Sequence, residues 1–494
     1  MIEEFGSTAF RWAGSDGSHR GALSRRKRQR RRSGVEVQIE RRGSEDSLPR
    51  SGRLQSLEVH SPPALAEAHP PKVRKRYDFG MILRSLALHD FKSFRDTQIS
   101  FGPFTLLVGT NASGKSNVQD ALRFLHGCAQ GFTLAEVMDE KWGAGGLLLW
   151  RGIRGGAREI IRAGGGSFHL SVSLSSEQDL RFEYSITVAN RKTTKPMEIV
   201  DESFEVGDRV VFEQSGRQED LRVISPESGP KARAYSTGRP ALARFAEDEK
   251  VARDKRDEAR QLVDAFKSIR FLDLAPDAMR SPTTPGEQSL GDRGENLSTV
   301  LFNLEKDREK KSALLGWLRA LTPLDVVDLR FHEDLAGRVL VYLVEASGRE
   351  SSAQSASDGT LRFLALAAAL LSSESGHLFF IEEIDNGLHP TRLHLLLDVI
   401  EQATRAFGCQ VVATTHNPNL LAYLSPETRE DAVLLYRQER DDASDAIRIV
   451  DVPDVRRILE TQDLGKLFAT GWLEDAIAFM NEEPLLTKRR KRAS

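Results

Sequence analysis

One eight-residue stretch constrains the fold of this chain more than any other. Residues 109–116 read GTNASGKS and fit the pattern GxxxxGK[ST] without a gap. They follow a short apolar run, Thr105–Val108, which is typical of a buried strand, and they precede a helical pattern over Asn117–Leu125. A strand, a glycine-rich loop and a helix in this order predict a phosphate-binding loop, in which backbone N–H groups and the helix N-terminus face the phosphates of a nucleotide.

The residues of this loop have separate expected tasks. Lys115 would reach the β- and γ-phosphates of ATP, and the Ser116 hydroxyl would coordinate Mg²⁺. The other residues expected to bind ATP are Gly109, Asn111, Ala112, Ser113, Gly114 and Asn117.

Two later strands carry polar side chains at their ends. The apolar run Leu378–Ile381 is followed directly by Glu382 and Glu383. Glu382 would hold Mg²⁺ directly or through water, and Glu383 would orient or deprotonate the water that attacks the γ-phosphate. A third strand, Gln410–Thr414, precedes His416, which would lie at the same edge of the sheet within reach of the γ-phosphate.

The order of these motifs resembles that of ABC-type ATPases, and specifically the RecF/SMC-like group with its AAA-type predicted ATPases. The segment SASDGTLRFLALAAALL is similar to the signature of that group, FIEEIDNGLHP to its Walker B and D-loop, and ATTHNPNLL to its switch-histidine segment. The resemblance implies that Ser357, Asp358 and Gly359 open a helix that closes on the nucleotide of a partner. It therefore implies a head-to-tail homodimer that forms with ATP.

Two residues differ from the commonest form of these motifs. Glu382 stands where many ABC-type ATPases have Asp, which changes the position of the carboxylate but not its ability to bind Mg²⁺. Asp358 replaces the first glycine of the transporter-type signature, which favours the RecF/SMC-like group. No glutamine is assigned to the Q-loop, although Gln130 is available.

The fold class expected is α/β, an ABC-ATPase-like head with a mixed, mostly parallel sheet, flanking helices and an inserted β-rich and helical subdomain. The expected boundaries are a disordered basic extension over 1–80, the first part of the head over 81–155, the insertion over 156–349, the second part of the head over 350–480 and a basic tail over 481–494.

Several elements can be expected from periodicity alone. Strands are expected over Ile82–Leu88 and Thr97–Phe101, with Phe91 and Phe94 in the turn between them, and antiparallel strands over 167–213. Helices are expected over Ala241–Phe271, Asn296–Leu321, Leu361–Leu371 and Thr391–Phe407.

Composition restricts the class of protein. The longest apolar run, Phe363–Leu371, has nine residues, far short of the ~20 of a membrane span, and the first residues lack the apolar region of a secretory signal. Two cysteines give neither a disulfide framework nor zinc spacing. We therefore expect a cytoplasmic protein, without a membrane partner, whose metal is held by oxygen ligands. The basic segments Arg25–Arg32 and Lys488–Arg492 are either arms that hold nucleic-acid phosphates or unstructured extensions.

Two functions use the same predicted ATPase. The first is a DNA-linked ATPase that acts in double-strand-break repair or genome maintenance as an ATP-gated clamp. The second is the ATPase subunit of a two-gene anti-phage module, whose closure licenses a separate toxin or nuclease. A nucleotide-stabilised scaffold without turnover is the non-enzymatic alternative.

Two further classes fit the sequence poorly. A transporter subunit would lack the long insertion between phosphate-binding loop and signature. An OLD-type nuclease would carry a Toprim metal site after His416, but the acidic residues there, Asp441, Asp442 and Asp445, lie in a polar stretch and are expected to be turn residues. We therefore expect no nuclease within this chain.

Overall fold

The computed structural model describes residues 80–143, 148–190, 197–215, 221–224, 233–235, 238–321, 325–372, 377–438 and 442–478. All of them belong to one unit, Pro63–Ser494. The basic segments Arg25–Arg32 and Lys488–Arg492, and Asp441, lie outside the described residues.

The centre of the molecule is a block of parallel strands. In sheet order these are β18 (Val433–Arg437), β3 (Phe104–Val108), β17 (Gln410–Thr415), β16 (Leu378–Ile381) and β12 (Arg270–Leu272). Every residue of β3, β16 and β17 is buried, as expected for parallel strands covered on both faces. The mixed α/β sheet expected from the sequence is therefore confirmed, but "mostly parallel" holds only for this central block, because most of the strand pairs in the whole sheet are antiparallel.

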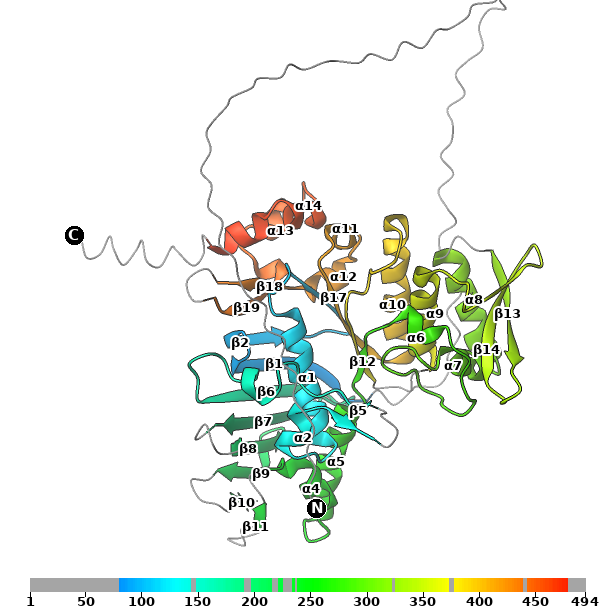
Figure 1. Ribbon diagram of the computed structural model, residues 1–494. Helices are drawn as coiled ribbons and strands as arrows, with labels where there is room; N and C mark the ends of the chain where they lie inside the picture. The colour runs from blue at the N-terminus through cyan, green and yellow to red at the C-terminus, as the bar shows by residue number, and fades with distance from the viewer. Residues whose placement is uncertain are drawn as a thin grey trace, which may run out of the picture. The chain divides into compact units, whose positions relative to one another are not determined.

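Antiparallel strands extend this block on one side (Figure 1). Among the described residues, fourteen strands share the sheet, in the order β11-β10-β9-β8-β7-β6-β1-β2-β19-β18-β3-β17-β16-β12. The additional strands are β1 (Ile82–Phe91), β2 (Phe94–Ser100), β6 (Ser167–Ser175), β7 (Arg181–Ala189), β8 (Glu198–Val206), β9 (Arg209–Ser215), β10 (Leu221–Ile224), β11 (Arg233–Tyr235) and β19 (Ser444–Arg448). Buried and accessible residues alternate along β6 and β7, which accounts for the period-two pattern in the sequence.

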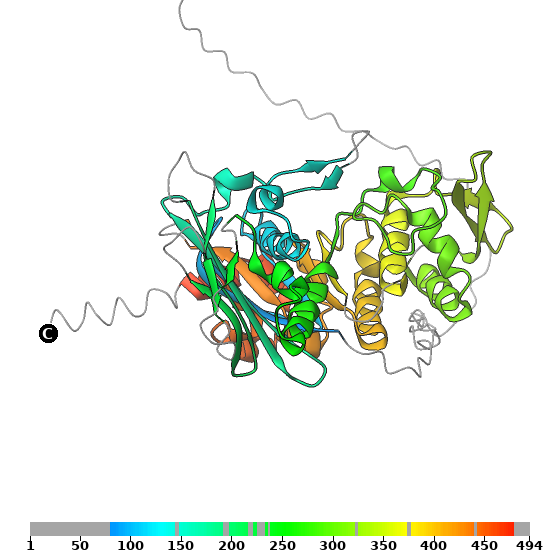
Figure 2. The same cartoon turned by 90° about the horizontal axis from the view of Figure 1, so that it is seen from below.

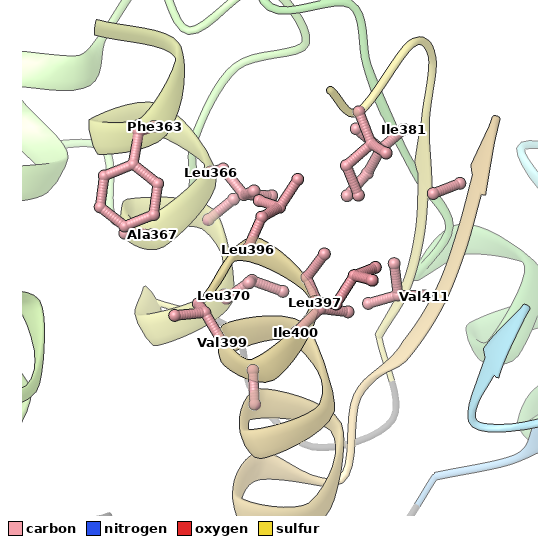
Figure 3. Packing of buried hydrophobic residues seen from close by; sticks show 14 of the residues in the cluster. Phe363, Leu366, Ala367, Leu370, Ile381, Leu396, Leu397, Val399, Ile400 and Val411 are labelled. Carbon is pink, nitrogen blue, oxygen red and sulfur yellow. The ribbon is translucent and has the colours of Figure 1, made fainter. Parts of the chain in front are cut away.

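Helices cover both faces of the sheet and create two cores. The helices α1 (Lys115–Ala129), α4 (Ala241–Glu247) and α5 (Arg253–Lys267) share one core with Leu107 of β3. The helices α9 (Asp358–Ser372) and α10 (Leu393–Phe407) share the other with Leu106 and Val108. Figure 3 shows side chains of α9 and α10 meeting between the two helices, with Val411 of β17 facing α10.

A second, three-stranded sheet packs against helices beside α9 (Figure 2). It consists of β13 (Val326–Glu333), β14 (Val339–Glu345) and β15 (Glu350–Ser352), and it contacts α7 (Leu297–Leu304) and α8 (Arg308–Leu321). The remaining elements are α2 (Leu134–Met138), β4 (Lys141–Trp142), β5 (Leu148–Trp150), α3 (Gly156–Glu159), α6 (Pro276–Met279), η3 (Pro390–Arg392), α11 (Pro418–Leu421), α12 (Pro426–Glu430), η4 (Ile449–Asp451), α13 (Val455–Ile458) and α14 (Leu464–Ala469).

Two expected helices are each broken in the structure. The range Ala241–Phe271 contains α4, a turn, α5 and strand β12, so Phe271 lies in the sheet. The range Asn296–Leu321 contains α7 and α8, because the Asp307 side chain accepts hydrogen bonds from the N–H groups of Glu309 and Lys310 and so starts a second helix.

Three turn assignments from the sequence are also wrong. Phe91 ends β1 and Phe94 begins β2; they pair with each other and are fully buried, because both rings pack in the core around α1. Asp445 lies in β19, where it accepts hydrogen bonds from Thr97, Tyr436 and Gln438. Asp442 does lie in the loop before that strand, with φ 56°.

Within the part of the chain that the structure describes, no helix is both long and apolar enough to cross a membrane.

Candidate nucleotide site

The carboxyl ends of the four strands β3, β16, β17 and β12 meet at one edge of the sheet. Val108 of β3 pairs with Thr415 of β17, and Ile381 of β16 pairs with Ala413 of β17, so the strands end nearly level. A cavity of about 510 Å³ opens above them. This edge is where open parallel sheets bind ligands, and it brings together the loops in which the sequence placed its candidate residues.

The phosphate-binding loop runs from β3 into α1 through a tightly packed turn. Gly114 has φ 111°, a conformation that favours glycine, and a Cβ there would lie 2.9 Å from the Phe94 ring. A Cβ on Gly109 would lie 2.3 Å from the carbonyl oxygen of Leu435. Both glycines are therefore required by the close approach of β2 and β18 to the loop.

The loop lines the cavity with polar groups. Its lining residues are Asn111, Ala112, Gly114, Lys115, Ser116 and Asn117. Ser113 lies beneath the loop, where its buried Oγ has no hydrogen-bond partner. Asn117 donates a hydrogen bond to Ser93 Oγ over 2.7 Å, which ties α1 to the turn between β1 and β2.

The Lys115 ammonium group lies folded against the loop. It donates hydrogen bonds to the carbonyl oxygens of Gly109 at 2.6 Å and Thr110 at 2.8 Å. Burial lowers the pKa of Lys115, and the nearby Glu383 carboxylate partly opposes that shift. A cation that is partly desolvated interacts more strongly with an anion than an exposed lysine does, so this position suits a phosphate.

Glu382 faces the cavity next to an arginine that sequence patterns did not single out. Arg154 Nη1 lies 3.5 Å from Glu382 Oε1, and the same guanidinium contacts the Ser116 carbonyl oxygen and the buried Asp120 carboxylate. Ser116 and Glu382 both line the cavity, and their hydroxyl and carboxylate oxygens are ligands that suit Mg²⁺. The residues present therefore fit a nucleotide with its metal ion.

Glu383 has an unusual backbone conformation. Its φ is 47°, in the left-handed region that non-glycine residues seldom adopt, and its N–H group donates a 2.9 Å hydrogen bond to Thr414 Oγ1. The carboxylate accepts a hydrogen bond from Asn386 over 3.3 Å and lies 3.9 Å from His416 Nδ1. Glu383 is thus close to both His416 and Lys115, but His416 is not among the residues that line the cavity, so its expected reach to the γ-phosphate stays a prediction.

The loop that follows Glu383 is fastened to the end of β17. Asp385 accepts hydrogen bonds from Thr415 Oγ1 at 2.8 Å and from Asn417 Nδ2 at 2.9 Å. The Ile384 N–H group bonds to the Thr414 carbonyl oxygen. The loop carrying Glu383 and the segment carrying His416 are therefore joined by these three hydrogen bonds.

The signature residues lie at the N-terminus of α9 and do not line this cavity. Ser357 caps the helix, because its Oγ accepts a hydrogen bond from the Thr360 N–H group. Asp358 is paired with Arg280. A Cβ on Gly359 would lie 2.3 Å from the Gly387 carbonyl oxygen, so α9 packs directly on the loop that follows Glu383.

Several cavity residues were not among the candidates chosen from the sequence. Besides Arg154, the cavity is lined by Asp273, Arg362, Asn386, Thr414 and Arg437. Arg362, Asn386 and Thr414 lie inside the segments that resemble the signature, the Walker B with its D-loop and the switch-histidine segment, so these motifs could have pointed to them. Gln130 lies at the far end of α1, bonded to His126, and does not line the cavity.

A phosphate-binding loop after β3, acidic residues after β16, which β17 separates from β3, and a mixed α/β sheet define the class of the protein, which is a P-loop ATPase domain. A family model described as "AAA domain, putative AbiEii toxin, Type IV TA system" matches residues 104–422, more than half of the chain. The chain therefore belongs to this AAA-domain family.

Two curated relatives share a short segment with the chain. The chain is 50% identical over 46 residues to the DNA replication and repair protein RecF of Synechococcus sp., and 46% identical over 46 residues to RecF of Gloeobacter violaceus. The match spans 9% of this chain and only 12% of each RecF. With the family match, it confirms the RecF-like resemblance of the ATPase domain.

Solved structures of SMC heads are also similar to the chain. An SMC head bound to the C-terminal winged-helix domain of ScpA is 16% identical with a TM-score of 0.44, covering 74% of this chain and 97% of that one. The SMC head domain from Thermotoga maritima is 13% identical with a TM-score of 0.37, covering 74% and 98%.

Proposed function

We propose that this protein binds and hydrolyses ATP with Mg²⁺ at the cavity above β3, β16 and β17. The observation that carries the proposal is the position of Glu383, which a hydrogen bond from its own N–H group to Thr414 holds beside Lys115 and His416. A carboxylate in this place can orient water against a phosphate held by the phosphate-binding loop.

The chain's own residues divide the work. The backbone of residues 109–114 and the Lys115 ammonium group bind the phosphates, while Ser116 and Glu382 provide the oxygen ligands for Mg²⁺. The bound ion would offset the negative charge of the phosphates. Glu383 accepts the proton of the attacking water, and the His416 imidazole lies 3.9 Å from its carboxylate.

Arg154 must change its contacts when Mg²⁺ and ATP bind. Its guanidinium contacts Glu382, whose carboxylate is needed for the metal ion. The phosphates of ATP are negatively charged, like the Glu382 carboxylate, and can therefore replace it as the partner of the guanidinium. Binding of nucleotide and metal then replaces an internal ion pair instead of leaving a carboxylate unpaired.

We propose that ATP also joins two copies of the chain head to tail. Ser357, which caps α9, and the first residues of the helix, Asp358 and Gly359, lie outside the cavity of their own chain, which leaves this N-terminus to face the nucleotide of a second copy. A helix N-terminus carries unpaired N–H groups and partial positive charge, both suited to a phosphate. Because Gly359 packs on Gly387, closure against a partner is transmitted to the loop that carries Glu383.

The cellular process that we propose is DNA repair or genome maintenance, with DNA as the partner. The support is the segment shared with RecF, whose name describes DNA replication and repair. A second candidate is the ATPase of a two-gene anti-phage module with a separate effector protein, which the family description, a putative AbiEii toxin of a type IV system, favours.

Steady-state ATPase measurements separate the two candidates. The purified chain is assayed alone and with single-stranded, duplex and gapped DNA, beside a Glu383→Gln control. We expect turnover that the control abolishes and that one form of DNA stimulates. Control-sensitive turnover that no DNA changes would move the proposal to the defence module, and turnover undiminished in Glu383→Gln would refute the assignment of Glu383.

A further inference from the structure

Arg280 lies outside the motifs and bonds to the signature loop, which is the segment between Ala353 and Asp358. It follows the short helix α6 and is distant in sequence from the signature at residues 357–359. Its Nη1 donates hydrogen bonds to the carbonyl oxygens of Gln354 and Ala356, both at 2.9 Å, and to that of Ala353 at 3.3 Å. Its Nη2 bonds to Asp358 Oδ1 at 2.5 Å.

The two segments that Arg280 joins rest on the same strand. Thr283, three residues after Arg280, exchanges backbone hydrogen bonds with Val339 of β14. Ala353, at the start of the signature loop, donates its N–H group to Val341 of β14. The segment that carries Arg280 is therefore anchored to β14. The loop between Ala353 and Asp358 is bonded to β14 at one end and to Arg280 at the other.

The pairing with Asp358 is an electrostatic requirement as well as a packing contact. This argument depends on the head-to-tail dimer proposed above. The Asp358 side chain is 68% exposed at the first residue of α9, where a second copy would bring the phosphates of its ATP. A carboxylate without a cation at that position would repel the phosphates and oppose the partial positive charge of the helix N-terminus.

We propose that Arg280 is a positioning residue for the partner's nucleotide, which both shapes the signature loop and neutralises Asp358. The Arg280 side chain is 27% exposed, and its guanidinium bonds to Asp358, whose side chain lies at the surface where closure would occur. Arg280 leaves the protomer's own cavity untouched, because neither it nor Asp358 lines that cavity. Loss of Arg280 then impairs dimer closure and ATP turnover, while each protomer still binds ATP in its own cavity.

The test begins with Arg280→Gln in the full chain. ATP affinity is measured by equilibrium binding at low protein concentration, and ATP-dependent dimerisation by light scattering in the Glu383→Gln background. We expect ATP affinity within about twofold of wild type and a loss of at least about tenfold in ATPase rate and dimer stability, the size expected for a charge-assisted hydrogen bond. Unchanged dimerisation and turnover would overturn the proposal.

A double variant distinguishes charge compensation from a purely structural role. With Asp358→Asn added to Arg280→Gln, the uncompensated carboxylate is gone, so most of the lost dimerisation and turnover returns. If Arg280 only braced the loop carbonyls, Asp358→Asn would restore nothing, and that result would refute charge neutralisation. The matched control is Arg338→Gln, which breaks another Arg–Asp pair, with Asp334 in the β13–β14 turn, and leaves turnover unchanged.

Two further comparisons keep the test decisive. If Arg280→Gln does not fold, Arg280→Lys is tested in its place, because it keeps the positive charge. Adding Asp358→Asn to Arg280→Lys should then increase neither dimerisation nor turnover. An increase in either would contradict the proposal. Failure of wild type and Glu383→Gln to dimerise with ATP would instead refute the head-to-tail dimer. The experiment therefore distinguishes failure of the Arg280 proposal from failure of the proposed head-to-tail dimer.

Discussion

The hydroxyl of Thr414 holds Glu383 in its left-handed conformation, and Thr414→Val removes that hydroxyl while keeping the shape of the side chain. A left-handed conformation costs a non-glycine residue roughly 1–2 kcal/mol. The 2.9 Å bond from the Glu383 N–H group to Thr414 Oγ1 offsets this cost, since such a bond contributes about 1 kcal/mol and an unpaired N–H group costs up to about 3 kcal/mol.

Without this bond, the left-handed conformation of Glu383 should become less favourable by an energy close to the cost of that conformation. An energy of about 1.4 kcal/mol corresponds to about tenfold in rate. We expect kcat for ATP hydrolysis to fall about tenfold in Thr414→Val, with ATP affinity within about twofold because Lys115 and its loop are unchanged. Steady-state kinetics and equilibrium nucleotide binding measure the two quantities.

Two controls isolate the hydroxyl. Thr414→Ser retains the acceptor and should keep most of the activity. Thr404→Val removes a buried hydroxyl from α10, where its partner is the Glu401 carbonyl oxygen, and should leave kcat unchanged. Wild-type kcat in Thr414→Val would refute the claim that this bond holds the catalytic carboxylate.

Lys115→Ala should abolish ATP binding, measured by equilibrium binding, because the loop loses its cation; retained affinity would contradict the site. Gly359→Ala should lower ATPase activity at least about tenfold, because the added Cβ lies 2.3 Å from the Gly387 oxygen and displaces the loop behind Glu383; normal turnover would show that this packing is not needed. Burial raises the pKa of Glu202 to about 7, so the folded state holds that proton more tightly than the unfolded chain. The free energy of unfolding should fall as pH rises from about 5 to about 8, and Glu202→Gln should flatten that dependence in urea titrations; an unchanged slope would contradict the assignment.

The centre of the sheet could be predicted from the sequence because strong local signals agree there. The strand Leu378–Ile381 has the boundaries expected, and β3 and β17 differ from expectation by one residue each. These strands are buried on both faces, so their apolar runs are unbroken, and each ends in a polar motif. The candidate residues of the cavity were found for the same reason.

The ends of several helices depend on long-range interactions that the periodicity of apolar residues in the sequence does not indicate. The expected helix over Ala241–Phe271 begins where α4 begins, but it misses the end of α4 at Glu247. The first two N–H groups of α4 bond to the buried Glu202 carboxylate from β8. That anchor fixes where α4 lies, and the chain turns after it to bring α5 against α1. A carboxylate 39 residues away in sequence leaves no local pattern.

Two arginines that pair with motif residues were missed because they come from distant segments. Arg154 follows the β4–β5 ribbon, and Arg280 follows α6, and neither belongs to a recognised motif. Their importance lies in long-range pairs, with Glu382 in one case and Asp358 in the other. Only the three-dimensional structure brings these charges together.

The most direct test of the central claim is the mass of Glu383→Gln in solution with Mg²⁺ and either ATP or ADP, measured by light scattering. The account predicts a dimer with ATP and a monomer with ADP, because binding without turnover traps the closed state. A protein that binds ATP yet remains a monomer would contradict ATP-gated closure.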